Sequence, residues 1–238
     1  MSIYALADLH LSLSNPEKSM ELFGHQWAGY LDRISEEWKA TVKPEDTVLI
    51  PGDISWATYI EKAEEDFSFI ASLPGRKLLS RGNHDYWWTT MKKLDEFFES
   101  HSFPGMELVR TNVTEVEGCL ITGTRGWMTD SAKSEDPDKK KIYEREKLRL
   151  GLCVSELDKA DPGHEKTHIL MIHYPPFPAQ QDRTEYSEII REAGIDVCVY
   201  GHLHGRAHRF VREGVFDGCR YICASADYTG FAPVLVKE

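Results

Sequence analysis

The sequence lacks the features of a membrane or secreted protein. It contains no apolar run long enough to cross a bilayer, and residues 1–8 lack the basic start and apolar core of a secretory signal. It also has no internal repeat, linker or low-complexity tract. We therefore expect a cytoplasmic protein without a membrane span. Its 238 residues suit one domain over residues 1–238.

Cysteine and basic residues are also scarce. The five cysteines form no C-x-x-C pair, and their odd number favours buried free thiols in a reducing cytosol. The 28 Lys and Arg residues stand against 39 Asp and Glu residues, which gives a net charge of -11. Because nucleic-acid-binding surfaces are basic, this balance disfavours a DNA or RNA partner.

The hydrophobic pattern predicts alternating strands and helices in the first third of the chain. Strands are expected at 2–7, 47–50 and 77–80, and helices at 17–42 and 57–72. This βαβαβ order predicts a parallel sheet with helices on its faces.

The rest of the chain continues the α/β pattern. The further predicted elements are a helix near 89–99, meandering strands at 106–110, 113–117 and 119–124, an exposed loop at 129–141, a helix at about 139–159, a strand at 167–172, a helix at 184–193, and strands at 196–200, 206–211, 214–217, 220–224 and 234–236, the last at a sheet edge. We predict an α/β sandwich of two sheets with helices packed outside.

Five short motifs that are rich in oxygen and nitrogen ligands follow these predicted strands. They are, in order, Asp8-Leu-His10, Gly52-Asp53, Gly82-Asn83-His84-Asp85, His173 and Gly201-His202-Leu-His204. Because ligands bind at the carboxyl ends of strands in open α/β sheets, we expect the five motifs to converge at one edge. Carboxylate, amide and imidazole ligands without thiolates suit Mn²⁺, Fe, Zn²⁺ or Ni²⁺ better than they suit a structural zinc site.

The spacing of the motifs favours two metals in one site. Asp8 and His10 are two residues apart in a segment expected to be extended, so both side chains should face the same side, and His202 and His204 repeat this spacing. Asp53 is the candidate to bridge two cations. Two metals about 3.5–4 Å apart can share a hydroxide that attacks phosphorus, and can hold both the attacking and the leaving oxygen. The set predicts hydrolysis of a phosphate ester.

The third motif also supplies a candidate catalytic pair. His84 is poorly placed to ligate the same metal as Asn83, so we expect it to meet the substrate. There it would act as a general acid for the leaving group or as a cation beside the phosphoryl oxygens. Asp85 is expected to orient His84 and raise its pKa.

Three further residues are candidates for substrate contact. Trp56 and Tyr86 follow ligand-bearing turns closely, although core packing is the usual role of such aromatic residues. Arg125 ends a predicted strand in a Gly-flanked turn, where it either binds phosphate in a bidentate manner or lies in a plain surface turn.

With these five motifs, the chain resembles the calcineurin-like metallophosphoesterase superfamily. That pattern is D-x-H, G-D, G-N-H-[D/E], H and G-H-x-H, and all five blocks lie in order between Asp8 and His204. The resemblance implies a four-layer αββα sandwich, with two mixed sheets flanked by helices and a dimetal site at the C-terminal ends of the strands. It also implies His84 as the catalytic histidine. The implied ligands are Asp8, His10, Asp53 and His204 for the first metal, and Asp53, Asn83, His173 and His202 for the second.

The second block narrows the choice within that superfamily. The run from Gly52 to Thr58 lacks the substrate-binding Arg of the protein Ser/Thr phosphatase branch, and the third block ends in Asp85. The chain is more similar to small bacterial-type phosphohydrolases, which include cyclic-nucleotide phosphodiesterases and nucleotide or lipid-sugar pyrophosphatases. The resemblance implies a small-molecule substrate, a phosphodiester or a pyrophosphate, and two divalent ions, with Mn²⁺ as the first expectation.

Other functions stay open at the level of sequence. A phosphomonoesterase or a nuclease would use the same chemistry, and a non-catalytic metal-binding scaffold would keep the same fold. Residues 86–91, 125–141 and 177–184 are expected to set the choice of substrate. The sequence does not indicate the oligomeric state or the native metal.

Overall fold

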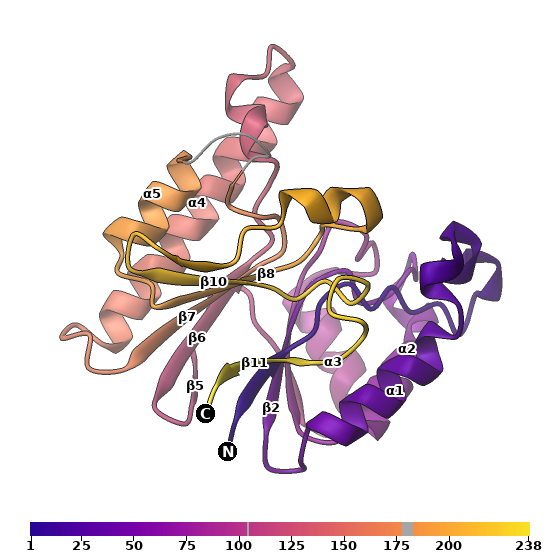
Figure 1. Cartoon of the computed structure of the whole chain (residues 1–238). Coiled ribbons are helices and arrows are strands. Elements are labelled where there is room, and N and C mark those ends of the chain that lie inside the picture. Colours follow the sequence, from indigo (N-terminus) through magenta and orange to yellow (C-terminus); the bar gives the residue numbers. More distant parts are fainter. Residues whose placement is uncertain (104, 178–182) are drawn as a thin grey trace.

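Two β-sheets packed face to face form the centre of the protein. The structure is a computed structural model that describes residues 1–103, 105–177 and 183–238 (Figure 1). In the first sheet the strand order is β11 (Val234–Lys237), β1 (Ile3–Ala5), β2 (Thr47–Pro51), β3 (Arg76–Ser80) and β4 (Met106–Leu108). In the second sheet it is β5 (Thr114–Val116), β6 (Cys119–Thr124), β7 (Thr167–Ile172), β8 (Val197–Tyr200), β10 (Cys219–Cys223) and β9 (Gly214–Phe216).

Both sheets are mixed. In the first, β1 to β4 run parallel and the edge strand β11 pairs antiparallel with β1. In the second, β6, β7, β8 and β10 run parallel, and the edge strands β5 and β9 are antiparallel to their neighbours. The parallel strands bring their carboxyl ends to a common edge, where loops can form a site.

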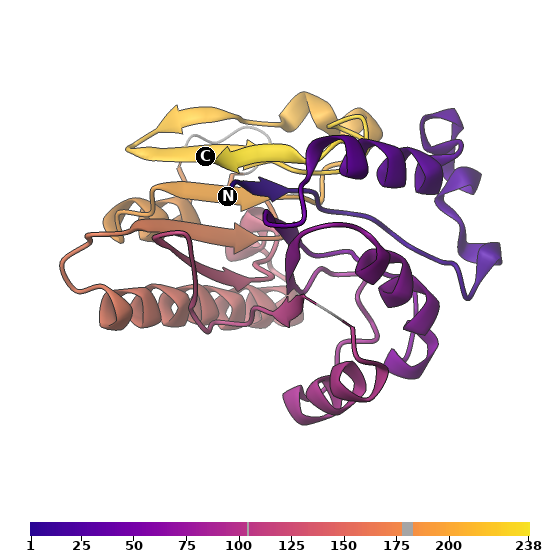
Figure 2. The same cartoon turned by 90° about the horizontal axis from the view of Figure 1, so that it is seen from below.

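Helices cover the outer faces of both sheets (Figure 2). Helices α1 (Tyr30–Thr41), α2 (Glu64–Ser72) and α3 (Met91–His101) pack on the first sheet, and α4 (Pro137–Ala160) and α5 (Glu185–Glu192) pack on the second. Short 3-10 turns are η1 (Pro16–Lys18), η2 (Met20–Phe23), η3 (His25–Trp27), η4 (Ile60–Lys62), η5 (Thr129–Lys133) and η6 (Gly205–Phe210). The four-layer αββα sandwich is confirmed. None of the described helices is long and apolar enough to span a membrane.

The alternation of side chains along the central strands explains the layers. In β2, Val48 and Ile50 are buried under the helices of the first sheet, whereas Leu49 points into the layer between the sheets. In β7, Met171 faces that inner layer and Leu170 faces α4 and α5. Each central strand therefore contributes to two apolar cores, and this burial holds the strand ends in fixed positions.

The helix expected at 17–42 begins only at Tyr30. Three 3-10 turns precede it, because Gly24 and Gly29 take positive φ angles of 133° and 59° that interrupt a helix. Leu22, an apolar residue within the expected helix, is 73% exposed. The helix expected at 57–72 likewise starts late, at Glu64.

Three further expectations about the second half need correction. The segments 106–110 and 113–117 do not form one meander, because β4 pairs with β3 in the first sheet while β5 pairs with β6 in the second. The strand expected at 206–211 is the 3-10 turn η6. The loop expected at 129–141 contains η5 and the start of α4. The edge strand and the five buried free cysteines are as expected.

Candidate metal centre

The seven expected ligands meet at the carboxyl ends of the strands. Asp8 and His10 follow β1, Asp53 follows β2, Asn83 follows β3, His173 follows β7, and His202 and His204 follow β8. Six of them form two groups in which all ligand atoms lie within 4.8 Å of one another. The first group is Asp8, His10 and His204, and the second is Asp53, His173 and His202. The fold therefore brings the strand ends of both sheets together at one site.

In the first group, two imidazoles lie close to each other and to one carboxylate. Nε2 of His10 lies 3.2 Å from Nε2 of His204, and the latter atom lies 3.6 Å from Oδ1 of Asp8. Oδ1 of Asp8 is buried and has no hydrogen-bond partner among the described residues. A divalent cation fits this arrangement, because it satisfies two imidazole nitrogens and an unpartnered carboxylate oxygen at once.

The second group is oriented by the backbone. Nδ1 of His173 lies 3.0 Å from the carbonyl oxygen of Pro51, and because a carbonyl only accepts, this nitrogen donates. Nε2 of His173 is thereby directed into the site, 2.8 Å from Oδ1 of Asn83 and 3.4 Å from Oδ2 of Asp53. Such a hydrogen bond on the far nitrogen is typical of metal-binding histidines.

Asp53 belongs to the second group and also reaches the first. Its Oδ2 is 3.4 Å from Nε2 of His173 and 3.7 Å from Nε2 of His10. Its Oδ1 accepts the backbone N–H of His84 at 2.8 Å. The carboxylate is the side chain positioned to bridge two cations, which is the expected role and stays a prediction.

The electrostatics of the centre favour bound positive charge. Burial disfavours the ionised form of Asp8, yet His204 and His173 lower its pKa to about 2. Burial likewise opposes charge on His173, but Asp53 and Asp8 raise its pKa to about 9. His204 behaves in the same way, since Asp8 and Asp227 raise its pKa to about 10 against the effect of burial. The carboxylates therefore attract cations at this edge.

The ligand turns are not extended, contrary to expectation. Asp8, His10, Asp53 and His202 have φ angles of 60°, 45°, 52° and 75°, in the left-handed region that is uncommon for residues other than glycine, although Asp and His adopt it more often than most. Backbone strain of this kind collects at functional sites, where the surrounding structure maintains it.

Two motif glycines make room for the carboxylates. A Cβ on Gly82 would stand 2.1 Å from Oδ1 of Asp53, and a Cβ on Gly201 would stand 2.5 Å from Oδ2 of Asp8. Any side chain at either position would collide with a candidate ligand. The glycines of the third and fifth motifs are therefore required by packing against the site.

The prediction that Asp85 orients His84 is wrong. Its carboxylate accepts the backbone N–H groups of Asp53 at 2.9 Å and Gly82 at 2.7 Å, and the indole N–H of Trp87 at 3.0 Å. It makes no hydrogen bond to the ring of His84. Asp85 instead ties the turn after β2 to the turn after β3, and so holds two ligand-bearing loops together.

His84 belongs to neither ligand group. Its ring lies 4.4 Å from Trp56 between centroids, and its Nδ1 has no hydrogen-bond partner among the described residues. Burial, and to a smaller extent the charge of His173, lower the pKa of His84, while Asp53 opposes them. The imidazole is thus free to meet a ligand.

Two hollows flank the groups. The first, of about 350 Å³, is lined by His10, His84 and His204 together with the apolar side chains of Met20, Phe23, Trp27 and Trp56. The second, of about 180 Å³, is lined by His202 together with Met128, Tyr174, Phe177 and Phe210. Each ligand group therefore has one largely apolar hollow beside it.

The three expected substrate contacts occupy different places. Trp56 lines the first hollow, and Tyr86 is 56% exposed with its ring 6.1 Å from that of His84. Arg125 is held elsewhere, because its guanidinium pairs with the buried Glu146 at 2.9 Å. Of the segments expected to set substrate choice, residues 178–182 lie outside the described chain.

Sequence reasoning missed Asp227. Its Oδ1 lies 2.8 Å from Nδ1 of His204, and its Oδ2 accepts the N–H of Gly205 at 2.9 Å. This buried carboxylate orients His204 as the Pro51 carbonyl orients His173. It lies after β10, outside every motif, so no local signal marked it.

The fold and the paired ligand groups are those of a metallohydrolase, and comparison with known proteins identifies the family. A family model described as calcineurin-like phosphoesterase matches residues 1–206, so the chain belongs to that family. The family uses a dinuclear metal centre to hydrolyse phosphate esters, and its members are metal-dependent hydrolases.

Solved structures share the fold. A protein of unknown function, AQ665 from Aquifex aeolicus, is 19% identical with a TM-score of 0.50, over 98% of this chain and 95% of that one. The protein TT1561 of Thermus thermophilus is 12% identical with a TM-score of 0.55, over 99% and 97% of the two chains. A search of curated protein sequences gives no match.

Proposed function

We propose that the chain hydrolyses a phosphodiester or a pyrophosphate, in which the reacting phosphorus carries a substituent on each side. The observation that carries this proposal is the pair of hollows, one beside each ligand group. A phosphomonoester has one substituent and would leave one hollow unused. The apolar and aromatic lining of both hollows suits substituents with apolar or planar parts.

We assign the metal ligands by their position in the two groups. The first cation would be held by Asp8, His10, Asp53 and His204, and the second by Asp53, Asn83, His173 and His202. Oxygen and imidazole donors without thiolate suit Mn²⁺, which we propose as the working metal ahead of Fe, Zn²⁺ and Ni²⁺. When bound, the two cations supply an activated water and neutralise charge on the phosphoryl oxygens.

The chain's own residues then position the substrate and move a proton. His84 lies in the wall of the first hollow, where Nδ1 of its ring has no hydrogen-bond partner among the described residues, and it donates a proton to the departing oxygen. Trp56, at 4.4 Å from that ring, holds His84 in place and packs against the substituent in the same hollow. Tyr86, whose exposed ring lies 6.1 Å from that of His84, contacts the substrate from outside that hollow. Asp85 acts indirectly, through the two turns that it joins.

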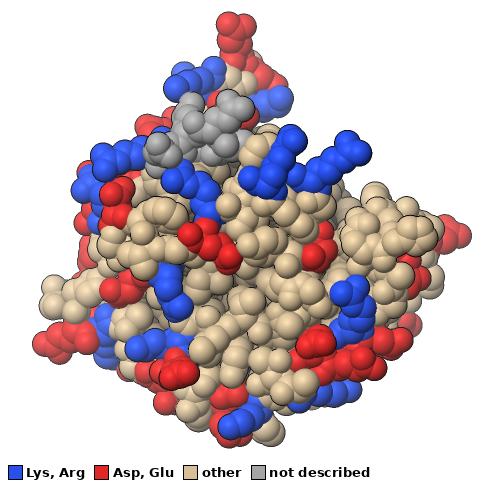
Figure 3. Space-filling view, in the orientation of Figure 1, with Lys and Arg blue, Asp and Glu red and all other residues tan. Residues whose placement is uncertain are grey.

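The other readings are less well supported. Basic and acidic side chains are interspersed on the face shown in Figure 3, where a nuclease would present a continuous basic track, and the net charge is -11. A non-catalytic scaffold has no need of the free His84 ring. We propose further that residues 1–238 act as a single cytoplasmic domain, in keeping with the five buried free thiols.

The test uses metal-stripped protein resupplied with Mn²⁺. Hydrolysis of bis(p-nitrophenyl) phosphate is compared with that of p-nitrophenyl phosphate, for the wild type, His84→Ala, and His164→Ala as a matched control. His164 pairs with Asp196 at 3.2 Å, outside both ligand groups. We expect faster cleavage of the diester, a loss of about 10²–10⁴-fold in His84→Ala with its metals retained, and no change in the control. Faster cleavage of the monoester, or full activity in His84→Ala, would contradict the proposal.

A further inference from the structure

A separate cavity lies where β3, β4 and β6 end and α4 passes over them. It is small, with a volume of about 30 Å³, and is lined by Arg81, Trp88, Val109, Arg110, Thr111, Gly123, Thr124, Arg125 and Arg149. We call it the arginine cavity. It shares no lining residue with the hollows beside the metal groups.

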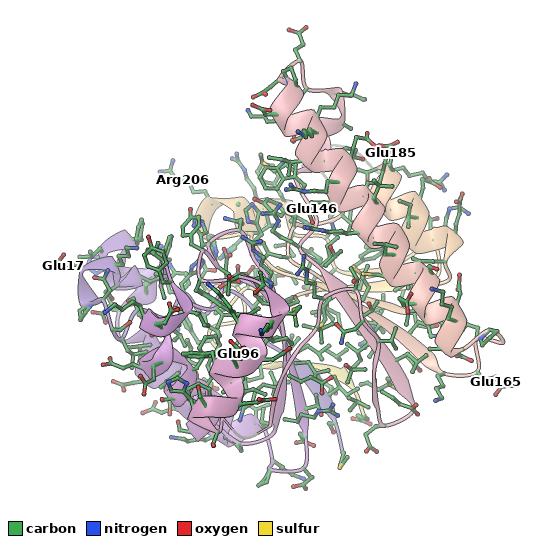
Figure 4. All side chains as sticks on the ribbon, turned by 180° about the vertical axis from the view of Figure 1, so that it is seen from behind. Glu17, Glu96, Glu146, Glu165, Glu185 and Arg206 are labelled. Carbon is green, nitrogen blue, oxygen red and sulfur yellow. The ribbon has the colours of Figure 1, made fainter. Side chains whose placement is uncertain are left out.

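Positive charge exceeds negative charge around the arginine cavity. Four of its lining residues are arginines, and the carboxylate that faces them is Glu146, which Figure 4 shows on the inner side of α4. Glu146 is fully buried, and its Oε1 accepts from Arg125 at 2.9 Å and from Arg149 at 2.7 Å. Arg81 and Arg110 have no carboxylate within 4.0 Å among the described residues.

Hydrogen-bond donors are also left over. The Nε atoms of Arg81 and Arg125 and the Nε1 atom of Trp88 are buried and have no partner among the described residues. Trp88 itself is only 7% exposed. Oε2 of Glu146 is also without a partner among the described residues, so three unpartnered donors stand against one unpartnered carboxylate oxygen. Buried donors without acceptors are uncommon and costly, and this surplus of donors indicates a ligand that accepts.

A tetrahedral oxyanion meets both requirements. Guanidinium groups bind phosphate oxygens in bidentate pairs, and an anion with several oxygens accepts from different walls of the cavity at once. A water molecule would satisfy some donors but leave the charge excess unchanged. A planar carboxylate has only two oxygens, which is too few to accept from donors that come from strands, a loop and a helix.

We propose that the arginine cavity binds a small dianionic oxyanion, namely phosphate or the phosphoryl group of a phosphomonoester. This site is distinct from the metal centre and does not depend on the function proposed above. Arg81 directly precedes the Gly82-Asn83 turn, so the bound anion would also brace a loop that carries a candidate metal ligand.

The experiment is a calorimetric titration of metal-loaded, full-length protein with inorganic phosphate at constant ionic strength. We expect one binding phase from the cavity, alongside any phase from the metal centre. Arg149→Gln and Arg110→Gln should weaken the cavity phase by about tenfold or more, because each removes a charge-assisted hydrogen bond. Arg110 is exposed, so this second variant is expected to fold even where Arg149→Gln does not.

The matched control is Arg145→Gln. Arg145 lies on the same helix with its Nε 3.7 Å from Oε1 of Glu146, but it does not line the cavity. It should leave the phase within about twofold. A titration in which neither cavity variant loses a phase, or in which Arg145→Gln loses as much, overturns the proposal. Loss of the metal-centre phase alone would instead count against the proposed function.

A second ligand identifies the source of the anion. Methylphosphonate keeps the charge but replaces one phosphate oxygen with a methyl group. Binding of both ligands with the same dependence on Arg149 and Arg110 supports a site open to a phosphomonoester. Binding of inorganic phosphate alone supports a site for the free ion.

Discussion

The metal centre and the arginine cavity lie at the same ends of the strands but have opposite chemistry. The metal centre gathers carboxylates and imidazoles, and it leaves an oxygen of Asp8 without a donor. The arginine cavity gathers guanidinium groups, and among the described residues it leaves nitrogens of Arg81, Trp88 and Arg125 without an acceptor, against one carboxylate oxygen of Glu146 without a donor. The sandwich supplies the positions, and the side chains at those positions decide the charge of the ligand.

The two regions also differ in how their residues are distributed along the sequence. Every candidate metal ligand belongs to a short motif directly after a strand. The arginine cavity combines residues from strand ends, a loop and α4, and its carboxylate comes from the middle of a helix. The comparison predicts that single substitutions in the metal centre remove chemistry, whereas those around Glu146 affect stability and anion binding.

The largest effect is expected for Asp53→Asn. This carboxylate lies between both ligand groups, so its loss should leave fewer than two metals bound and lower turnover by about 10³-fold, since metal stabilisation of the transition state is worth several kcal/mol. Metal analysis and the rate of diester hydrolysis measure the two effects. Asp158→Asn, at an exposed position, is the control. Two bound metals with normal turnover in Asp53→Asn would remove its bridging role.

The next largest effect is expected for Glu146→Gln. It breaks the buried ion pairs with Arg125 and Arg149 and should lower the free energy of unfolding by about 3 kcal/mol, as measured by urea denaturation. Inorganic phosphate should restore part of that loss. Glu144→Gln, which removes a surface pair with Lys147, should cost about 0.5 kcal/mol. Equal losses of stability in the two variants would show that the buried ion pairs of Glu146 contribute no more than a surface pair.

A smaller effect is expected for Asp227→Asn. The substitution weakens the hydrogen bond to Nδ1 of His204 without removing a candidate ligand, so metal affinity should fall by about 10–100-fold. Competition with a chelator measures the change. His208→Gln, which alters another partner of Asp227 at 3.2 Å, should change the affinity much less. An unchanged affinity in Asp227→Asn would separate Asp227 from the metal centre.

The smallest effect concerns a buried charge outside both regions. Lys77 is 2% exposed, donates to the carbonyl of Leu73, and has its pKa lowered by burial to about 8 from 10.5. The folded state therefore binds fewer protons than the unfolded state between pH 8 and 10.5, and wild-type stability should rise with pH in that window. Lys77→Met should be more stable at pH 7 by about 1 kcal/mol, and this advantage should shrink above pH 8. A pH-independent difference in denaturation would contradict this account.

The layers and the location of the centre could be predicted from the sequence. The motifs follow buried strands, so their convergence depends only on parallel pairing, which the βαβ pattern indicates. The start of α1 could not be predicted from the apolar stripe, because the conformations of Gly24 and Gly29 outweigh the periodicity. The sequence also did not indicate that β4 and β5 belong to different sheets, because a short connection does not show which partner each strand takes.

The roles of individual polar residues were the hardest to predict. Asp85 adjoins His84 in the chain, yet its carboxylate turns to backbone N–H groups of two loops. Asp227 and Glu146 act on residues distant in the sequence, and neither lies in a motif. Adjacency along the chain does not determine where a side chain points, and contacts over long sequence separations have no local signal.

The most direct test of the account is a metal titration of stripped protein with Mn²⁺, in which metal bound per chain and bis(p-nitrophenyl) phosphate hydrolysis are measured on the same samples. The account predicts two Mn²⁺ per chain, with full activity reached only when the second is bound. Saturation at one metal with full activity, or two bound metals without hydrolysis of any phosphate ester, would contradict it.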